Sequence, residues 1–556
     1  MKKVFFYVLV MTTLCATVFT GCKDDEDTEL KRITLSETSK MLKPEETFKL
    51  SVEFFSRSTP YKEVTWSSNN NAVATVAEDG TVTAHGEGNA TITVTSKHNA
   101  SISATCAVEV TTEVFETMKG AVSGVWPAHS TVYITDQIWV EQGKSLTVEQ
   151  GVTIIVQDGE VGASRAPIEF FVEGSLYLKG TEAYPILVTV ASSKRTEEYK
   201  YAGLWGGFVR GDNFSELLFD HVIVEYTGGL CRANSQSVLA GLNVADKDRT
   251  AQILTNNPNG KIVIMNSTFR YAESDALYFM GGKAIVANNI IHTIGETDND
   301  GINMKAGVQV DIAYNLTFSV NSNGMKLSSS GESPERHQAL IRAYNNTIVN
   351  SGWRRTKNLK GGSIFLEQNA LGSVYNNLVL NCKLLGKTPN LNNPSSNKGG
   401  AHWESILDYN FYASGSQTLN NPALRVVEGA EILTAFAGYT HDDADYWHDG
   451  RLGTPIMDGN SLIATAPGAL DPGFVNFGFN TVALDDDGYS FEKRGYDFHV
   501  TSASSPVVAG ANGKTPRSDF SGKFAPYFAN APFMVVDGKE YKSPVPSARY
   551  GAFGTK

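Results

Sequence analysis

The sequence is short of positive charge and of paired cysteines, and each deficit excludes a class of protein. Its 556 residues hold 47 Lys and Arg against 59 Asp and Glu, a formal net charge of −12. Phosphate backbones are bound by clustered cations, so we expect no nucleic-acid partner. No two of the five cysteines form a CxxC pair, which argues against a zinc site or a disulfide framework. Cys106, Cys231 and Cys382 are predicted to be small buried side chains.

Long apolar runs are also missing, apart from a short one at the N-terminus. Two lysines precede the apolar run 4–19, which is too short to span a bilayer and is typical of an export signal. The string Phe-Thr-Gly-Cys at 19–22 resembles a lipobox. That resemblance implies that residues 1–21 are a lipoprotein signal peptide and that Cys22 is acylated. Lipid on Cys22 would then be the only membrane attachment.

An acidic cluster follows that cysteine directly. Lys-Asp-Asp-Glu-Asp at 23–27 resembles the signal that sends lipoproteins to the outer face of the outer membrane in Bacteroidota-like bacteria. Residues 22–31 are predicted to be a solvated, unstructured tether. We therefore expect a surface-exposed outer-membrane lipoprotein; the alternative is the same tether facing the periplasm.

Residues 32–112 alternate apolar and polar side chains between frequent turn signals, which predicts a small β-sandwich. The strings Val-Thr-Trp-Ser-Ser-Asn at 64–69, Val-Ala-Thr-Val at 73–76 and Asp-Gly-Thr-Val-Thr-Ala at 79–84 resemble a group-2 bacterial immunoglobulin-like (Ig-like) domain. The resemblance implies a spacer; direct adhesion is the alternative.

From residue 119 to 556 the strands are short and asparagines recur before apolar segments. Asn266, Asn289, Asn315, Asn346 and Asn377 are spaced by 23, 26, 31 and 31 residues. This repeat favours stacked coils whose asparagine amides pair along the axis. The strings resemble the right-handed β-helix superfamily of pectate-lyase-like proteins, with an irregular cap at about 420–556. The expected fold is all-β, an Ig-like sandwich followed by a right-handed parallel β-helix.

One face of the predicted helix carries polar and aromatic side chains. We align the segments 241–245, 276–280, 301–305, 324–328 and 363–367, in which alternate side chains point outward. Such a face suits an extended polysaccharide, because aromatic rings stack on sugars and polar groups bond hydroxyls. The ligand-binding candidates on this face and its loops are Asn243, Tyr278, Asn303, Trp353, Arg354, Phe365 and Glu367.

Three functions remain open at this point. The first is capture of a polysaccharide without turnover, the second a polysaccharide lyase or other glycan-degrading enzyme, and the third a structural adhesin. For a lyase the resemblance implies a Lys or Arg base, here Lys305 or Lys326, and Ca²⁺ held by Asp298 and Asp300. No complete lyase or hydrolase signature is present. The acidic loops at 441–450 and 485–488 are weaker candidates for a metal site.

Overall fold

The computed structural model describes residues 30–55, 62–111, 116–296, 298–355, 363–383, 401–402, 405–417, 419, 421, 426–427, 430–431, 458, 460–509 and 533–556. The expectations about Cys22, the acidic cluster 23–27 and the loop 441–450 fall outside these residues. The last two residues of the predicted tether 22–31 belong to the first unit instead, because Leu30 is buried and the Lys31 N–H donates to the Phe55 carbonyl at 3.0 Å. Within the described part, no helix is both long and apolar enough to cross a membrane.

The first unit is a β-sandwich whose alternating side chains fill one core. Val82, Ala84, Ile92, Cys106 and Val108 are each fully buried in it. Three sheets have the strand orders β1-β4, β2-β9-β8-β5 and β3-β7-β6. The strands are β1 (Arg32–Leu35), β2 (Ser39–Leu42), β3 (Thr47–Lys49), β4 (Val52–Phe55), β5 (Val64–Ser68), β6 (Ala74–Val76), β7 (Thr81–Ala84), β8 (Gly88–Ser96) and β9 (Ser103–Val110).

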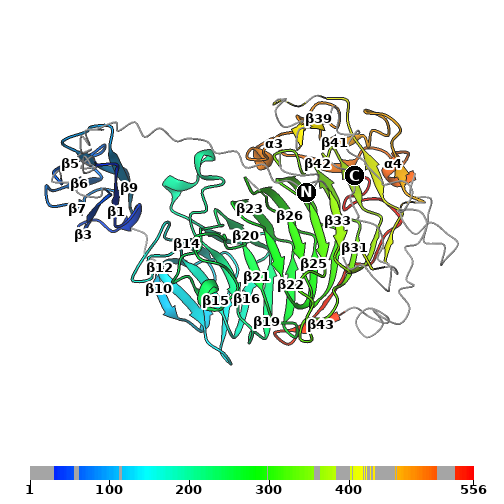
Figure 1. The fold of residues 1–556 in the computed structure, drawn as a ribbon, viewed down its shortest axis with the longest axis horizontal. Helices are drawn as coiled ribbons and strands as arrows, with labels where there is room; N and C mark the ends of the chain where they lie inside the picture. Colours follow the sequence, from blue (N-terminus) through cyan, green and yellow to red (C-terminus); the bar gives the residue numbers. More distant parts are fainter. Residues whose placement is uncertain are drawn as a thin grey trace, which may run out of the picture.

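The second unit is a parallel β-helix with three faces, seen side-on in Figure 1. The central coils each contribute one strand to each face, and these strands pair in parallel with their counterparts in the next coil. Face A contains the end of β12 (Thr131–Val140), then β15 (Glu169–Val172), β18 (Gly207–Arg210), β21 (Ile253–Thr255), β24 (Leu277–Phe279), β27 (Ile302–Met304), β30 (Met325–Ser328) and β33 (Ile364–Glu367).

Faces B and C follow the same pattern. Face B contains the start of β12, then β14 (Thr153–Val156), β17 (Ile186–Thr189), β20 (Val222–Glu225), β23 (Thr268–Ala272), β26 (Ile290–Ile294), β29 (Leu316–Val320), β32 (Thr347–Val349), β35 (Leu378–Leu380), β37 (Phe411–Ala413) and β40 (Leu462–Ile463), and β10 (Glu116–Ala121) pairs with β12 at its edge. Face C contains β11 (Gly124–Trp126), β13 (Ser145–Val148), β16 (Ser175–Lys179), β19 (Glu216–Asp220), β22 (Lys261–Met265), β25 (Gly282–Ala287), β28 (Val308–Ala313), β31 (Leu340–Tyr344), β34 (Leu371–Tyr375) and β36 (Ile406–Leu407).

The remaining elements are short. They are η1 (Ser192–Lys194), η2 (Glu197–Tyr199), α1 (Gln236–Leu239), β38 (Val426–Val427), β39 (Ala430–Glu431), β41 (Phe474–Asn476), α3 (Phe491–Arg494), β42 (Asp497–Val500), α4 (Pro506–Ala509), β43 (Phe533–Val536) and β44 (Lys539–Lys542).

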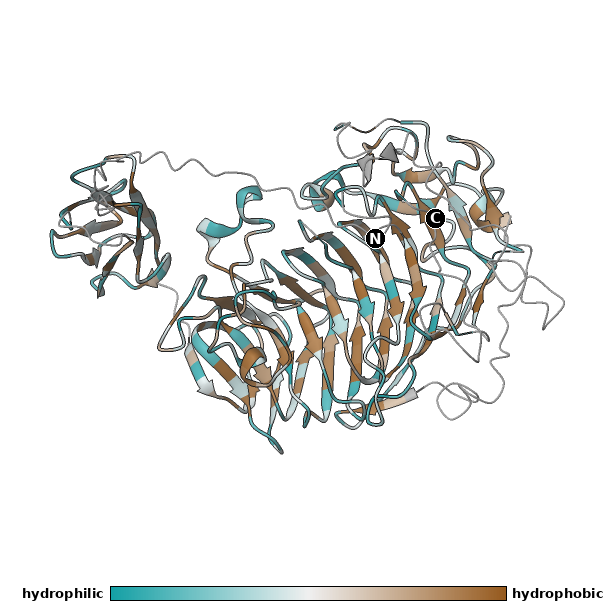
Figure 2. Ribbon diagram, viewed as in Figure 1, coloured by the Kyte–Doolittle hydropathy of each residue, from teal (hydrophilic) through white to brown (hydrophobic). Residues whose placement is uncertain are grey.

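The core of the β-helix is built from rows of apolar side chains in register. Along face A, Leu277, Ile302, Met325 and Ile364 pair coil to coil, and each is at most 1% exposed. A coil buries its apolar row only against the coils on either side of it. Hydrophobic residues therefore concentrate in the strands and hydrophilic ones in the turns (Figure 2). The all-β prediction, a sandwich followed by a parallel β-helix, is confirmed.

An asparagine ladder runs along one corner of the helix. Asn289 donates from Nδ2 to Oδ1 of Asn315 at 2.9 Å, and the same bond joins Asn315 to Asn346, Asn346 to Asn377, and Asn377 to Asn410. Each Oδ1 also accepts the backbone N–H of the residue one coil earlier, for example Asn289 N–H on Asn315. The ladder therefore satisfies turn groups that would otherwise be buried without partners.

The predicted start of this ladder was wrong by one residue. Ser267, whose N–H donates to Asn289 Oδ1 at 3.0 Å, occupies the ladder position, so the first step is 22 residues. Asn266 lies just before it with φ 52°, in the left-handed conformation that asparagine tolerates. Its side chain bonds Asp220 instead, at 2.8 Å.

Two faces of the helix are covered by other parts of the chain. On face B, the outward row Phe318, Val349 and Leu380 packs against Phe491 and other aromatic residues from 474–498. On face C, outward residues including Val263 pack against the β43–β44 hairpin. Among the described residues, the loop 231–249 containing α1 covers the early coils of face A and packs over Leu254. In the coils that follow, Tyr278, Lys305 and Lys326 are half-buried, whereas Phe365 and Glu367 are buried.

Candidate functional site

A cleft of about 600 Å³ opens on face A where the α1 loop ends. Its wall is the loop 242–251, its floor consists of side chains from β21, β24, β27 and β30, and its far edge is formed by the turns 273–275 and 298–300. Side chains on its floor point outward because they alternate with the buried row in each strand.

The predicted outward row is largely in register. Tyr278 pairs with Asn303, Asn303 with Lys326, and Lys326 with Phe365. Ser328 pairs with Glu367 in the next row. The strand alignment thus predicted four coils of this face correctly.

The alignment of Asn243 with this row was wrong. The strand that pairs with β24 is β21, and Leu254 occupies the position beside Tyr278. Asn243 follows α1 in a loop, where its Nδ2 donates to Cys231 Sγ at 3.2 Å. The loop nevertheless places Asn243 in the wall of the same cleft.

Carboxylates and amides form a second ladder at the edge of the cleft. Asp275 accepts the backbone N–H of Asp300 at 2.6 Å, and Asp300 in turn accepts the N–H and Nδ2 of Asn323 at 3.0 and 2.7 Å. Both carboxylates converge on Asn303, whose Nδ2 donates to Asp275 at 2.8 Å and to Asp300 at 3.2 Å. These bonds fix the orientation of Asn303 and leave its buried Oδ1 without a hydrogen-bond partner in the described structure.

Two acids at this edge hold protons unusually tightly. Burial, and then the neighbouring Asp300 carboxylate, raise the pKa of Asp275 to about 7. Burial also raises the pKa of Glu273 to about 7, although its carboxylate lies 3.8 Å from the Arg249 guanidinium. The edge therefore carries less negative charge near neutral pH than its composition implies.

Cations occupy the other side of the cleft. The Lys305 ammonium lies 5.4 Å from the centroid of the Tyr278 ring. Burial, and then the nearby Lys326 ammonium, lower the pKa of Lys305 to about 8. Burial opposes the charge of Lys326 too, but Asp300 and Glu367 raise its pKa above the ordinary value, and its Nζ lies 3.6 Å from Glu367. Among the described residues, Lys305 has no carboxylate within ion-pair distance.

Two ligand-binding candidates do not belong to this site. Trp353 is 1% exposed, packs against Leu419 and Leu484, and donates its Nε1–H to the Asn381 carbonyl at 2.7 Å. Arg354 donates to the carbonyls of Ile294, Gly295 and Ser319, each at 3.0 Å. Both predictions were wrong because these side chains complete the hydrogen bonding of the chain where it leaves the coil.

Phe365 and Glu367 lie at the margin of the site. They are in register with Lys326 and Ser328 but are 3% and 7% exposed, respectively. Phe365 therefore has little surface for a ligand, whereas Glu367 acts through its ion pair with Lys326.

The aspartates suggested for Ca²⁺ do not fit that role. Asp298 is 61% exposed and forms an ion pair with Arg355, and Asp300 is engaged by asparagine amides. The residues that the structure describes contain no group of three or more His, Cys, Asp or Glu placed to hold a metal ion. In the loop 485–488, Asp486 pairs with Arg494 and Asp487 with Lys200.

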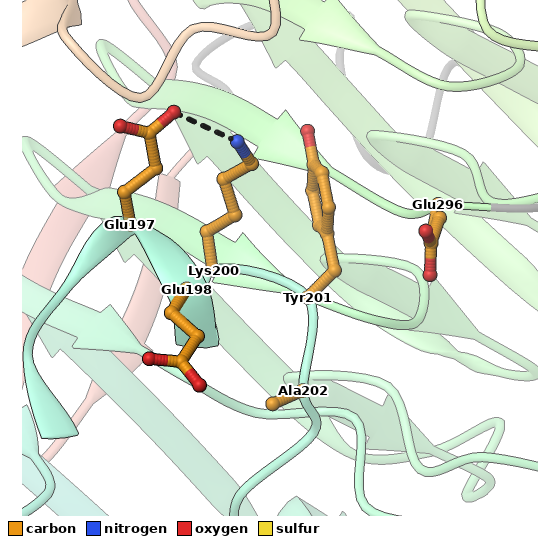
Figure 3. Close-up of a pocket in the computed structure, with 6 residues that line it drawn as sticks. All are labelled: Glu197, Glu198, Lys200, Tyr201, Ala202 and Glu296. Atoms are coloured by element: carbon orange, nitrogen blue, oxygen red, sulfur yellow. Dashed lines mark hydrogen bonds and ion pairs between the residues drawn. The ribbon is translucent and has the colours of Figure 1, made fainter.

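A second hollow of about 490 Å³ lies beside the η1–η2 segment and is drawn in Figure 3. Glu197 is paired with Lys200 at 3.2 Å, while Glu198 and Glu296 lie on either side of Tyr201. The Arg354 guanidinium lies 5.3 Å from the centroid of that ring. This hollow separates two packed segments and lacks the unpaired, desolvated cation that distinguishes the face A cleft.

Sequence reasoning missed the wall of the cleft. Leu242, Lys247, Asp248 and Arg249 come from the insertion between β20 and β21, and Glu273 from the turn before β24. The insertion carries no strand periodicity, so only its position after a buried strand could have indicated that it folds back over face A.

Chemically, the cleft combines one aromatic ring, two neighbouring ammonium groups and a row of fixed carboxyl and amide groups. An anionic group can pair with the ammonium groups, and hydroxyls can donate to the carboxylates and to Asn303 Oδ1. The arrangement suits a ligand that carries an anionic group and hydroxyl groups.

Comparison with known proteins identifies the N-terminal unit. None of the curated proteins matches this chain. Residues 29–108 match the family model of the bacterial Ig-like domain (group 2). An Ig-like domain followed by a parallel β-helix is an architecture typical of surface proteins.

Proposed function

We propose that this protein captures an acidic polysaccharide in the face A cleft. The observation that carries the proposal is Lys305, a desolvated ammonium without a carboxylate partner among the described residues, beside an aromatic ring and a second lysine. A buried cation left unpaired is costly, and an anionic ligand group would offset that cost.

The rest of the cleft supports a sugar rather than a small inorganic anion. The Tyr278 ring offers an apolar surface on which a pyranose can stack. Asp275, Asp300 and Asn303 present fixed acceptors on the opposite side. Because the floor combines side chains from four successive coils, neighbouring sugar units of a polymer can contact different coils.

The proposed location follows from the N-terminal sequence. We propose that Cys22 carries lipid and that the acidic tether presents the protein on the outer surface of the outer membrane. There the Ig-like domain and the β-helix would project toward polysaccharides in the surroundings.

A lyase is the second candidate, favoured by one observation. The pKa of Lys305, about 8, is close to the value that a general base needs near neutral pH. In that case the neutral Lys305 amine would take the proton beside a uronate carboxylate that pairs with Lys326. The carbon–oxygen bond to the neighbouring sugar would break as the double bond forms, and the departing oxygen would take up a proton from solvent. A lyase and a non-catalytic binding protein would both bind acidic polysaccharides. Only the lyase would release unsaturated products, so product formation distinguishes the two functions.

The test is a panel of acidic and neutral polysaccharides run against the chain from Lys23 onward. Retardation in affinity gels reports binding, and absorbance of unsaturated sugars reports elimination. We expect retardation by acidic polymers only. Tyr278→Phe should keep this retardation, Tyr278→Ala should weaken it by about 10-fold, and Tyr184→Ala, an exposed tyrosine in a distant turn, should leave it unchanged. Retardation by neutral polymers alone, or by none, would contradict the proposal and favour a protein-binding adhesin.

A further inference from the structure

The row of side chains that points outward along face B begins with two apolar residues. Tyr133 and Ile155 are paired in neighbouring coils and lie on the side of their strands away from the core. They are nevertheless only 3% and 7% exposed, because Met41 of the Ig-like domain packs on both. Met41 itself points away from the core of its own domain and is 6% exposed.

Polar contacts surround this apolar patch. Thr38 Oγ1 donates to Asp158 at 2.8 Å, and Gln157 Nε2 donates to Glu37 at 3.3 Å. At the edge, Arg165 pairs with Glu53 at 2.9 Å. An apolar centre with a polar rim is the usual composition of a specific protein interface.

Burial in this interface affects the ionisation of Asp158. Its side chain is 2% exposed, and burial raises the pKa of its carboxyl group against the opposing effects of Lys194 and Thr38. The groups that contact it are Thr38 from the Ig-like domain and Lys194 from η1. A carboxyl group of the β-helix is thus desolvated by a domain that precedes it in the chain.

The segment 192–201 extends the contact to the other end of face B. At its start, Ser192 donates to Glu109 of the Ig-like domain from its N–H at 3.2 Å and its Oγ at 3.0 Å. At its end, Lys200 pairs with Asp487 at 2.5 Å and the Tyr201 hydroxyl donates to the Asp487 carbonyl at 3.3 Å. Asp487 belongs to the segment that covers the later coils, so the insertion bridges the Ig-like domain and the C-terminal cap.

We infer that the Ig-like domain is a fixed arm docked on face B, rather than a spacer that swings freely. The bridge 192–201 locks it to the cap as well as to the first coils. The docked arm leaves face A uncovered and holds it in one orientation relative to the N-terminal domain. This inference does not depend on what the face A cleft binds.

The test measures the distance between the two units in the chain from Lys23 onward. Spin labels are attached to Ala100→Cys in an exposed turn of the Ig-like domain and to Ala183→Cys in an exposed turn of the β-helix. Cys106, Cys231 and Cys382 are buried and burial raises the pKa of each thiol, so the protein without engineered cysteines measures background labelling. A docked arm gives one narrow distance distribution.

Variants separate docking from folding. Met41→Asp with Glu109→Ala places a charge against Tyr133 and removes the acceptor of the Ser192 hydrogen bonds. We expect the distribution to widen severalfold. Lys49→Ala breaks an exposed ion pair within the Ig-like domain and should leave the narrow peak unchanged. Circular dichroism of each variant monitors folding, and Thr38→Ala offers a milder change of the interface. A broad distribution in the unmodified protein, or a narrow one in the folded double variant, would overturn the inference.

Discussion

At the residue scale, the candidate site depends on how little water reaches Lys305. Its ammonium group lies beside a tyrosine ring and near another lysine, and the carboxylates of Asp275, Asp300 and Glu367 act on it only from beyond ion-pair distance. The same lysine on an open surface would be fully charged at every physiological pH and paired with water. Desolvation makes it both a strong anion-binding group and one that titrates near neutral pH.

This position predicts a pH dependence of binding. Burial and Lys326 lower the pKa of Lys305 to about 8, so the side chain is charged below that pH and loses its charge above it. Affinity for an acidic polysaccharide should therefore fall as the pH rises from 7 to 9, because Lys305 loses its charge while Asp275 and Glu273, with pKa values of about 7, gain theirs. In Lys305→Arg, whose guanidinium stays charged, the fall should be smaller. Calorimetric titration at several pH values and constant ionic strength measures this affinity. If the affinity of Lys305→Arg fell with pH as it does in the unmodified protein, another group would be responsible.

At the scale of the element, two edges of the β-helix are stabilised by ladders of side chains rather than by single bonds. In the asparagine ladder, Asn346 donates to Asn377 Oδ1 and to the Ile312 carbonyl, both at 2.9 Å, and accepts from Asn315. Fully satisfied buried networks are stable, whereas a gap leaves several groups unpaired at once.

Substitutions in the ladder should distinguish its members from neighbouring asparagines. Asn346→Ala should lower the free energy of unfolding by about 3 kcal/mol, because it leaves buried backbone groups without partners. Asn266→Gly should change it by less than about 1 kcal/mol, since glycine accepts the left-handed conformation found there. Urea unfolding measures both. Equal costs would indicate that Asn266, and not Ser267, belongs to the ladder.

The same scale shows why some predictions succeeded. The two-residue alternation of the strands sufficed to place Tyr278, Asn303 and Lys326 side by side, because register in a β-helix follows from the buried apolar row. The prediction for Asn243 failed because the insertion that contains α1 resembles a strand in sequence but does not pair with β24. The predictions for Trp353 and Arg354 failed because residue type does not reveal whether a loop side chain points outward or donates to backbone carbonyl groups of the protein.

At the scale of the whole molecule, the chain covers its own β-helix unevenly. The Ig-like domain, the segment 192–201 and the residues around α3 cover face B, and the C-terminal hairpin covers part of face C. The outward row of face B changes along the helix to match these covers, from Tyr133 through Glu225 and Arg270 to Phe318. In the part of the chain that the structure describes, the α1 loop covers the early coils of face A, and the cleft opens beside it.

The contact of α3 with face B should loosen in acid. Burial opposes the charge of Glu492, but His292 at 2.7 Å and the Arg270 guanidinium lower its pKa to about 2. A lowered carboxyl pKa adds stability above the unfolded value of 4.5, and this stability is lost as the pH falls through 2. Burial lowers the pKa of His292, so its contribution is lost as the pH falls below its ordinary value of 6.5.

Glu492→Gln should therefore be less stable than the unmodified protein at pH 7, by about 1 kcal/mol after allowance for solvent screening, and the two should converge toward pH 2. Urea unfolding across this range measures the difference, with Glu540→Gln on the exposed hairpin as the control. A difference that does not depend on pH would exclude the carboxylate as its cause.

The most direct test of the central claim is the affinity of the cleft for an acidic oligosaccharide identified in the polysaccharide panel. It is measured by calorimetry at pH 7 for the unmodified protein, Lys305→Met and Lys144→Met, the last altering an exposed lysine in a distant turn. The structure predicts that Lys305→Met weakens binding by at least about 10-fold while Lys144→Met binds normally. Equal affinity in all three proteins would contradict the assignment of the face A cleft as the binding site.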